Sequence, residues 1–242
     1  MQKKIIIYDF DGTLTPYSVT RFEILEKCGY KGGTDNPELV DSFKDKFMKE
    51  NANFYDAVYR TFIEKVNCTS YKMTADSISM GAEDMEFNVG VDEFFEWIKD
   101  SNISNYILSS GVKTMIEKTK IAKYFDEIYA TTFKFDEFGI ARDIDCLIDD
   151  EAKSLYIEKI MKDNNRDDCR DIIYIGDGLT DYYAMEYVKN NGGTTIFVYQ
   201  DENSEDVLKA KESDVVSFFF LADYSNDSDL SNYIKMWSVL NV

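Results

Sequence analysis

Two short apolar segments in this chain each run directly into a turn that is rich in aspartate. Residues 4–8 (KIIIY) precede DFDGTLT at residues 9–15, and residues 171–175 (DIIYI) precede GDGLTD at residues 176–181. A continuous apolar run, without alternating polar residues, is typical of a strand buried on both faces, as in a parallel sheet that helices cover. These segments therefore predict an α/β fold.

The acidic turns predict a shared site. Ligands of parallel α/β sheets gather at the carboxyl ends of the strands, so we expect Asp9, Asp11, Asp177 and Asp181 to converge if the two strands are neighbours. Close carboxylates repel one another unless a cation or protons intervene. Oxygen ligands without thiolate or imidazole suit Mg²⁺, so the four aspartates are the candidate metal ligands. Either motif alone would also be explained by an Asp-Gly turn that closes a strand.

The rest of the chain alternates between helical and strand patterns. Residues 17–88 show apolar residues at helical spacing and predict an all-helical insertion after the first strand. Residues 1–16 and 89–242 are then expected to form a Rossmann-like core, a parallel sheet with helices on both faces. Within it we predict helices at 91–98, near 114–122, at 150–162, at 179–190 and at the C-terminus, strands at 105–108, near 128–130, at 194–199 and at 215–221, and a hairpin at 133–139.

The composition limits the domain organisation, the catalytic residues and the partners that this chain can have. With 242 residues, 44% of them hydrophobic, the chain can form one large domain or a core with a smaller insertion. It contains no histidine, which excludes His-based triads and histidine zinc sites. The formal net charge of −19 argues against nucleic acid and anionic membranes as partners. An anionic substrate would therefore depend on a bound cation and on a few local donors.

Cysteine spacing and apolar run lengths bear on the cellular compartment. Cys28, Cys68, Cys146 and Cys169 show no CxxC spacing, so we expect buried free thiols rather than a zinc site or a disulfide framework. Asp9 interrupts the first apolar run after five residues, and no later run approaches the roughly 20 residues that span a bilayer. A cytoplasmic protein is the expectation.

Two further segments fall between the acidic motifs. The sequence Leu108-Ser109-Ser110-Gly111 ends a predicted strand, and Lys153 lies in the first turns of a predicted helix. Taken alone, either serine is explained as the N-cap of the following helix, and Lys153 as a solvated helix charge, with Lys159 on the same helix as an alternative. Their order, DxDGTLT, then serine, then lysine, then GDGxxD, is the informative feature.

This ordered set resembles the haloacid dehalogenase superfamily on its phosphatase branch, over essentially the whole chain. The helical insertion resembles the cap of the phosphoserine-phosphatase-like group. The resemblance implies a haloacid-dehalogenase-like core and a Mg²⁺-dependent phosphatase that forms an aspartyl-phosphate on a small-molecule phosphomonoester. It assigns Asp9 as the nucleophile and Asp11 as the general acid and base. Further roles fall to Ser109 as a phosphoryl donor, Lys153 as a charge stabiliser, Asp177 as a metal ligand, and Asp181 as a support for the metal or for Lys153.

Substrate-binding candidates follow from the same resemblance. Gly12, Ser110 and Gly111 are expected near the phosphoryl group, and the candidates for specificity are Tyr17, Ser18, Arg21 and Arg60. Phosphoserine phosphatases usually carry serine where this chain has Gly12, and an acidic cap residue where it has Ser18. Phosphoserine is therefore a less favoured substrate than another small metabolite. The aromatic residues of the insertion are interpreted as its own core in preference to a ligand-stacking surface; they are Phe43, Phe47, Phe54, Tyr55, Tyr59 and Phe62.

Other functions stay open on sequence alone. A phosphotransferase differs from a phosphatase only in which acceptor reaches the phosphoryl group. A signalling receiver domain also accepts phosphate on aspartate beside an acidic pair, a hydroxyl residue and a lysine, although Asp11 and a cap are not expected there. A catalytically inactive binding protein is disfavoured because all the motif residues are present.

Overall fold

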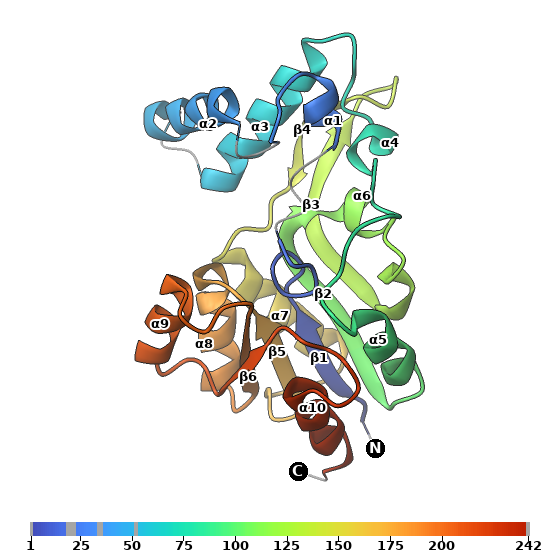
Figure 1. The fold of residues 1–242 in the computed structure, drawn as a ribbon, viewed down its shortest axis with the longest axis vertical. Helices are drawn as coiled ribbons and strands as arrows, with labels where there is room; N and C mark the ends of the chain where they lie inside the picture. The colour runs from blue at the N-terminus through green and yellow to red at the C-terminus, as the bar shows by residue number, and fades with distance from the viewer. Residues whose placement is uncertain (1, 18–22, 33–35, 51–52, 241–242) are drawn as a thin grey trace.

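A computed structural model describes residues 2–17, 23–32, 36–50 and 53–240. Its centre is a seven-stranded sheet in the order β4-β3-β2-β1-β5-β6-β7, in which β4 is antiparallel to β3 and the other neighbours are parallel (Figure 1). The strands are β1 (Lys4–Tyr8), β2 (Ile103–Val112), β3 (Glu127–Phe135), β4 (Ala141–Cys146), β5 (Ile172–Gly176), β6 (Thr194–Tyr199) and β7 (Phe218–Leu221). The predicted parallel α/β core is confirmed.

Strand β1 is buried on both faces, as its sequence predicts. Ile6 and Tyr8 point into one apolar layer, whereas Ile5 and Ile7 point into the other, and all four are fully buried. This period of two follows from the pleat of a strand. Strand β1 contains no carboxylate. The first one, that of Asp9, follows directly after the last residue of the strand.

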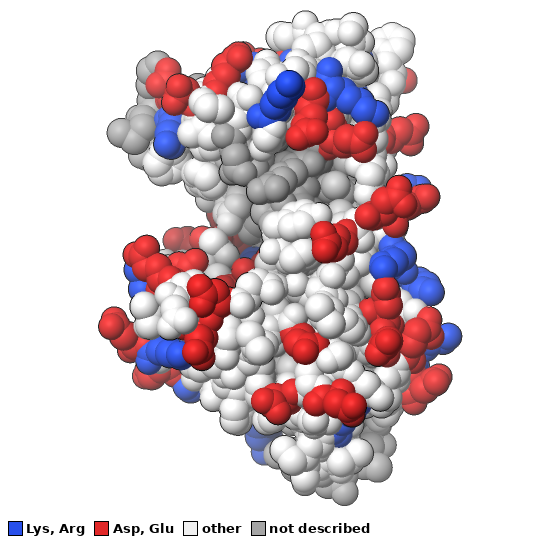
Figure 2. Space-filling model, viewed as in Figure 1, with Lys and Arg blue, Asp and Glu red and all other residues white. Residues whose placement is uncertain are grey.

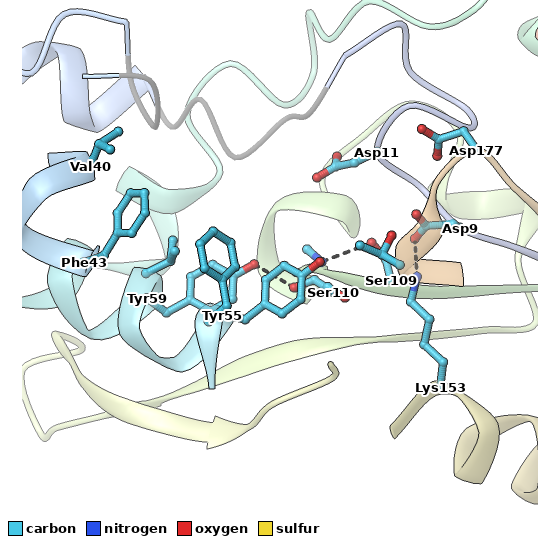
Figure 3. A pocket seen from close by; sticks show the side chains of 14 residues that line it. Asp9, Asp11, Val40, Phe43, Tyr55, Tyr59, Ser109, Ser110, Lys153 and Asp177 are labelled. Carbon is cyan, nitrogen blue, oxygen red and sulfur yellow. Dashed lines mark hydrogen bonds and ion pairs between the residues drawn. The ribbon is translucent and has the colours of Figure 1, made fainter. Parts of the chain in front are cut away.

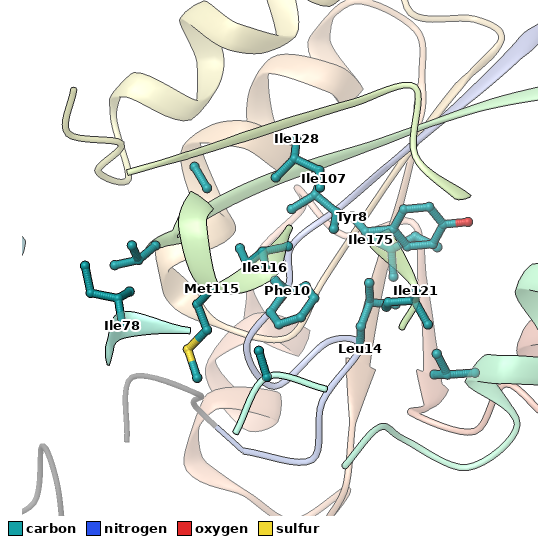
Figure 4. Close-up of a cluster of buried hydrophobic side chains, with 14 of the residues drawn as sticks. Tyr8, Phe10, Leu14, Ile78, Ile107, Met115, Ile116, Ile121, Ile128 and Ile175 are labelled. Carbon is teal, nitrogen blue, oxygen red and sulfur yellow. The ribbon is translucent and has the colours of Figure 1, made fainter. Parts of the chain in front are cut away.

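Helices cover both faces of the sheet (Figure 1). One layer contains α5 (Val91–Lys99), α6 (Lys113–Ile116) and α10 (Asp229–Val239), and the other contains α7 (Ala152–Asp163), α8 (Tyr182–Asn190) and α9 (Glu205–Glu212). Figure 4 shows part of the first layer, in which Tyr8 and Ile175 of the sheet and Ile116 of α6 belong to one buried cluster. This packing holds the ends of β1 and β5 in place.

The insertion lies beyond the carboxyl ends of the parallel strands (Figure 1). Its described helices are α1 (Glu23–Lys27), α2 (Pro37–Glu50), α3 (Phe54–Asn67) and α4 (Ala75–Ile78). Asn53 caps α3 by accepting a hydrogen bond from the Tyr55 amide at 2.9 Å. We refer to α1–α4 below as the cap.

The hairpin β3–β4 extends from the sheet to the cap (Figure 1). The amide of Ala141 donates to the Met73 carbonyl at 2.7 Å, and the Asn67 side chain donates to the Ala141 carbonyl at 2.8 Å. Thr74 and Ile140 form an isolated antiparallel bridge. The hairpin was predicted, but its contact with the cap was not, because nothing local in the sequence indicates that the two segments meet.

Several predicted elements differ in detail. The helix predicted near 114–122 is the short α6 followed by a 3₁₀ turn, η2 (Ala122–Tyr124), and the helix predicted at 179–190 begins with a 3₁₀ turn, η3 (Leu179–Asp181), before α8. The strand predicted at 215–221 starts only at Phe218, and α9 was not predicted. The cysteines are free, but only Cys169 is buried, and Cys68 is exposed. No described helix has both the length and the apolar character needed to cross a membrane.

Candidate active site

The two acidic motifs follow adjacent strands and lie at the same edge of the sheet. The chain passes from β1 to β2 on one side of the sheet and later returns to β5 on the other side. Such a reversal of strand order opens a crevice at the carboxyl ends of the strands. The Asp9 amide donates to the Ile175 carbonyl at 2.9 Å, which fixes the end of β1 against β5. Asp9 and Asp177 therefore leave neighbouring strands at the same edge.

Three carboxylates form a cluster at this edge. Asp9, Asp177 and Asp181 each offer an oxygen, and these oxygens lie within 4.8 Å of one another. Asp9 and Asp181 are buried, whereas Asp177 is partly buried. Asp11 lines the same cavity, but among the described residues it is not part of this carboxylate cluster. Figure 3 shows its carboxylate directed toward the cap.

Lys153 enters the cluster from the first turn of α7. Its ammonium lies 2.6 Å from Asp181 Oδ1 and 3.3 Å from Asp9 Oδ1, and its side chain is 1% exposed. Lys159, the alternative on the same helix, is about half exposed and pairs with Asp163. The lysine in the cluster is thus Lys153, and its explanation as a solvated helix charge is wrong.

Asp181 is held by four hydrogen bonds. Its Oδ1 accepts from Lys153 Nζ and from the Tyr174 hydroxyl, both at 2.6 Å. Its Oδ2 accepts from the amides of Asp177 at 3.2 Å and Gly178 at 3.3 Å. Both oxygens are therefore engaged within the protein. The sequence analysis did not identify Tyr174 as a site residue. Its neighbours in β5 face the opposite layer of the sheet, so the alternation of side chains along the strand places Tyr174 on the same side as Lys153.

Burial and mutual repulsion raise the pKa values of Asp9 and Asp177. Burial raises the pKa of Asp9 to about 7, although the Lys153 charge opposes the shift. Burial, followed by the charges of Asp181 and Asp9, raises the pKa of Asp177 well above its ordinary value. For Lys153, burial favours the neutral amine, but the carboxylates of Asp181 and Asp9 outweigh it and raise the pKa. One ammonium thus leaves the three carboxylates only partly compensated.

Gly12 allows the first acidic turn to approach the second. Its φ of +78° lies in the left-handed region, and a Cβ atom there would lie 2.0 Å from Asp177 Oδ2. Next to it, the Thr13 hydroxyl donates to Asp177 Oδ1 at 2.8 Å. The DGT sequence therefore orients Asp177 across the gap between β1 and β5.

The turn after Asp11 has a support that the sequence analysis did not identify. The Asn88 side chain donates to the carbonyls of Thr13 at 2.8 Å and Thr15 at 3.2 Å. The Tyr224 hydroxyl donates to the same Thr13 carbonyl at 3.0 Å. These partners come from distant parts of the chain, so only the fold reveals them.

Ser109, Ser110 and Gly111 lie at the end of β2, as predicted. The pairing of β2 with β3 shifts between Ser109 and Val112, which indicates a bulge. Neither serine caps α6, whose N-cap is Val112 without a side-chain bond. Ser109 Oγ accepts from the Gly111 amide at 3.1 Å, while Ser110 Oγ is buried and makes no hydrogen bond within the described part of the chain.

A cavity of about 380 Å³ lies between the acidic cluster and the cap (Figure 3). Its core wall includes Asp9, Asp11, Ser109–Gly111, Lys153, Asp177 and Thr180. The cap contributes Val40, Phe43, Phe54, Tyr55, Val58 and Tyr59. The preferred interpretation of the aromatic residues as cap core is therefore incomplete, because residues such as Tyr59 are buried in the cap and also line the cavity.

The remaining substrate-binding candidates lie in different places. Gly12 and Tyr17 line a neighbouring groove on the other side of Asp11 and Asp177. Arg60 is not among the described residues that line the cavity; it pairs with Asp143 of the hairpin at 2.6 Å. Ser18 and Arg21 lie outside the described residues.

The acidic cluster fits a divalent cation such as Mg²⁺. All its donors are oxygens, and Asp9 Oδ1 is buried without a hydrogen-bond partner even though Lys153 is near. The hydrogen bonds of Asp181 occupy both its oxygens, so Asp9 and Asp177 are the more available ligands. Figure 2 shows acidic side chains spread over both halves of the molecule, in keeping with the net charge of −19. An anionic ligand would be repelled by this negative charge, and a cation bound at the acidic cluster would offset the repulsion.

Comparison with known proteins gives a consistent result. A model of the haloacid dehalogenase-like hydrolases matches residues 6–186, which contain both acidic motifs and Lys153. An uncharacterized protein of Borreliella burgdorferi is 24% identical over 279 residues, covering 98% of this chain and 97% of its own. A solved phospho-aspartyl intermediate analogue of phosphoserine phosphatase has a TM-score of 0.64 at 19% identity, covering 98% of this chain and 99% of that one. Phosphoserine phosphatase in its apo form gives a TM-score of 0.65 at 17% identity, covering 97% and 98%. These structures share the fold.

Proposed function

We propose that this chain, which belongs to the haloacid dehalogenase-like hydrolase family, is a phosphatase that hydrolyses a small-molecule phosphomonoester through an aspartyl-phosphate on Asp9. The observation that carries the proposal is the position of Asp9. It is a buried carboxylate at the end of β1, 3.3 Å from Lys153, and it faces a cavity that Asp11 also lines.

In the first step, an Asp9 oxygen attacks phosphorus as the ester P–O bond breaks, and Asp11 donates a proton to the leaving alkoxide. Asp11 lies at the cavity wall with its carboxylate turned toward the cap, where the alcohol part of a substrate would lie (Figure 3). In the second step, Asp11 accepts a proton from the water that attacks phosphorus, which regenerates Asp9 and releases phosphate. A general acid and base of this kind typically contributes about 10²–10⁴-fold to the rate.

The phosphoryl oxygens need donors because negative charge spreads over them in the transition state. Lys153 supplies a fixed positive charge, and Asp181 with Tyr174 holds it in place. Ser109 and Ser110 supply hydroxyls from the β2 bulge. Asp9 and Asp177 are the residues that would hold Mg²⁺, which neutralises charge between a carboxylate and a phosphate when it is bound. Asp181 is assigned to Lys153 in this scheme.

The proposal is tested by phosphate release from a panel of phosphorylated metabolites, with MgCl₂ and with EDTA. Wild-type protein is expected to release phosphate from some of them only with MgCl₂, and Asp9→Asn from none, with unchanged circular dichroism. Full activity in folded Asp9→Asn would contradict the proposal. A phosphoryl adduct that lasts minutes to hours without turnover would favour the receiver function instead, because a switch must hold its phosphate.

A further inference from the structure

The cavity has two chemically different walls, and the cap wall points to a class of substrate. Every described cap residue that lines it is aliphatic or aromatic, namely Val40, Phe43, Phe54, Tyr55, Val58 and Tyr59. Figure 3 shows several of them facing the carboxylates of the core across the cavity. We infer that this wall binds an apolar, ring-sized alcohol group, so that the substrate is the phosphomonoester of a hydrophobic alcohol. The inference rests on the proposed phosphatase function.

The volume leaves room for such a group. A cavity of about 380 Å³ lies within the range of about 300–1,000 Å³ that is typical of small-molecule pockets. A phosphoryl group against Asp9 would occupy only the core end. The remaining space lies next to the cap wall, where an apolar group would displace water from apolar side chains.

Phe54 is the key residue of this wall. It opens α3 and is 48% exposed, although its ring packs edge-on against Phe43 and Tyr55, with ring centroids 5.6 Å apart in both pairs. Phe43, by contrast, is 7% exposed and packs against the ring of Phe54. An exposed aromatic group on a buried aromatic base, at the wall of a cavity, is typical of a ligand-binding surface.

Three basic side chains of the cap pair with acidic residues and do not line the cavity. Arg60 pairs with Asp56 and Asp143, on the side of α3 that meets the hairpin. Lys46 and Lys65 pair with Glu64 and Glu38; none of these side chains is among the described lining residues.

The cation that does line the cavity, within the described residues, is Lys153, and it is already paired with Asp181 and Asp9. The described cap wall therefore offers no cation for a substrate carboxylate and no carboxylate for a substrate ammonium. Against the part of this wall that the structure describes, a zwitterion such as phosphoserine would bury both of its charged groups without partners, which is unfavourable. An uncharged apolar group avoids this cost.

The test compares kcat/KM for benzyl phosphate, ethyl phosphate and O-phosphoserine with MgCl₂. All three are esters of primary alcohols, which limits differences in leaving-group reactivity. We expect benzyl phosphate to exceed both others by about 10-fold or more, the range that an apolar pocket provides. Phe54→Ala is expected to lower kcat/KM for benzyl phosphate about 10-fold and to lower that for ethyl phosphate by a much smaller factor. Phe138→Ala, at an exposed phenylalanine of the hairpin outside the cavity, should change neither.

Two results would overturn the inference while the phosphatase function stands. They are faster turnover of O-phosphoserine than of benzyl phosphate, and an equal effect of Phe54→Ala on the benzyl and ethyl esters. Absence of release from all three esters by folded wild-type protein would instead count against the phosphatase function itself, and the inference would fall with it.

Discussion

The ammonium of Lys153 lies 2.6 Å from Asp181, and both side chains are almost completely buried. The Tyr174 hydroxyl and two backbone amides hold the same carboxylate, so Asp181 fixes the lysine at a set position beside Asp9. Breaking a buried charge pair is strongly destabilising because the surviving charge loses its partner. The same lysine is therefore needed both for the stability of the core and for the proposed binding of the phosphoryl group.

Replacing Lys153 tests this link. Lys153→Met is expected to lose phosphatase activity and to lower the free energy of unfolding by about 3–5 kcal/mol, because Asp181 is left without its cation. Lys159→Met is the matched control on the same helix: Lys159 is exposed, so a change within about 0.5 kcal/mol and full activity are expected. Urea denaturation and phosphate release measure both effects. Equal losses in the two variants would contradict the assignment.

Substitution of two glycines distinguishes the effect of backbone strain from that of a steric clash in the site. Gly12 and Gly139 both have left-handed backbones, with φ of +78° and +71°, so alanine costs roughly 1–2 kcal/mol at either position. A Cβ atom at Gly12 would also meet Asp177, whereas one at Gly139 would meet nothing within 4 Å. Gly139→Ala should keep full activity. Gly12→Ala should lose more stability and most activity, and a variant that behaved like Gly139→Ala would contradict the close approach.

Metal binding should appear as a change in thermal stability. In wild-type protein, MgCl₂ at about 100 times its dissociation constant is expected to stabilise the fold by about 2.7 kcal/mol, or roughly 5–10 °C in Tm, relative to EDTA. Burial and the neighbouring carboxylates raise the pKa of Asp177, which means that its charge is unfavourable in the fold. The Asp177→Asn variant removes this charge and should therefore be at least as stable as wild type in EDTA. Its response to MgCl₂ should be largely lost. Differential scanning fluorimetry measures this, and an undiminished response would exclude Asp177 as a ligand.

The cysteines should differ in reactivity. Burial, with a smaller effect from Asp168, raises the pKa of the Cys169 thiol to about 12, so the reactive thiolate is scarce near neutral pH. Iodoacetamide at pH 8 is expected to label the exposed Cys68 in the native protein and Cys169 only after unfolding. Because the folded pKa is raised, the neutral Cys169 thiol favours the fold below its ordinary pKa, and this contribution is lost as the pH rises toward 12. Rapid labelling of Cys169 in peptide maps of native protein would contradict its burial.

The features that the sequence predicted are those with a local signal. Strands β1 and β5 follow from unbroken apolar runs, and each leads directly into an acidic turn, so Asp9 and Asp177 could be placed before the fold was known. The fold class follows from the alternation of strands and helices. Lys153 could be selected only through the order of the motifs, because helical position alone does not separate a buried lysine from a solvated one such as Lys159.

The features that were missed depend on contacts between different helices and strands. The bulge that carries Ser110 is set by the register of β2 against β3, and the hydrogen bonds of Asp181 involve Tyr174, seven residues away on another element. The cap aromatic residues share one helical spacing whether they face the cap core or the cavity. Only the position of the cap over the sheet shows that Phe54 lies at the cavity wall.

The most direct test of the central claim is to find the phosphoryl group on Asp9. Asp11→Asn protein, mixed with a substrate and MgCl₂ and quenched in acid, should carry one added phosphoryl group, and peptide mass spectrometry should locate it on Asp9. Slowed second-step hydrolysis in this variant is what allows the adduct to accumulate. Turnover without any adduct on Asp9, or an adduct on another residue, would contradict the account.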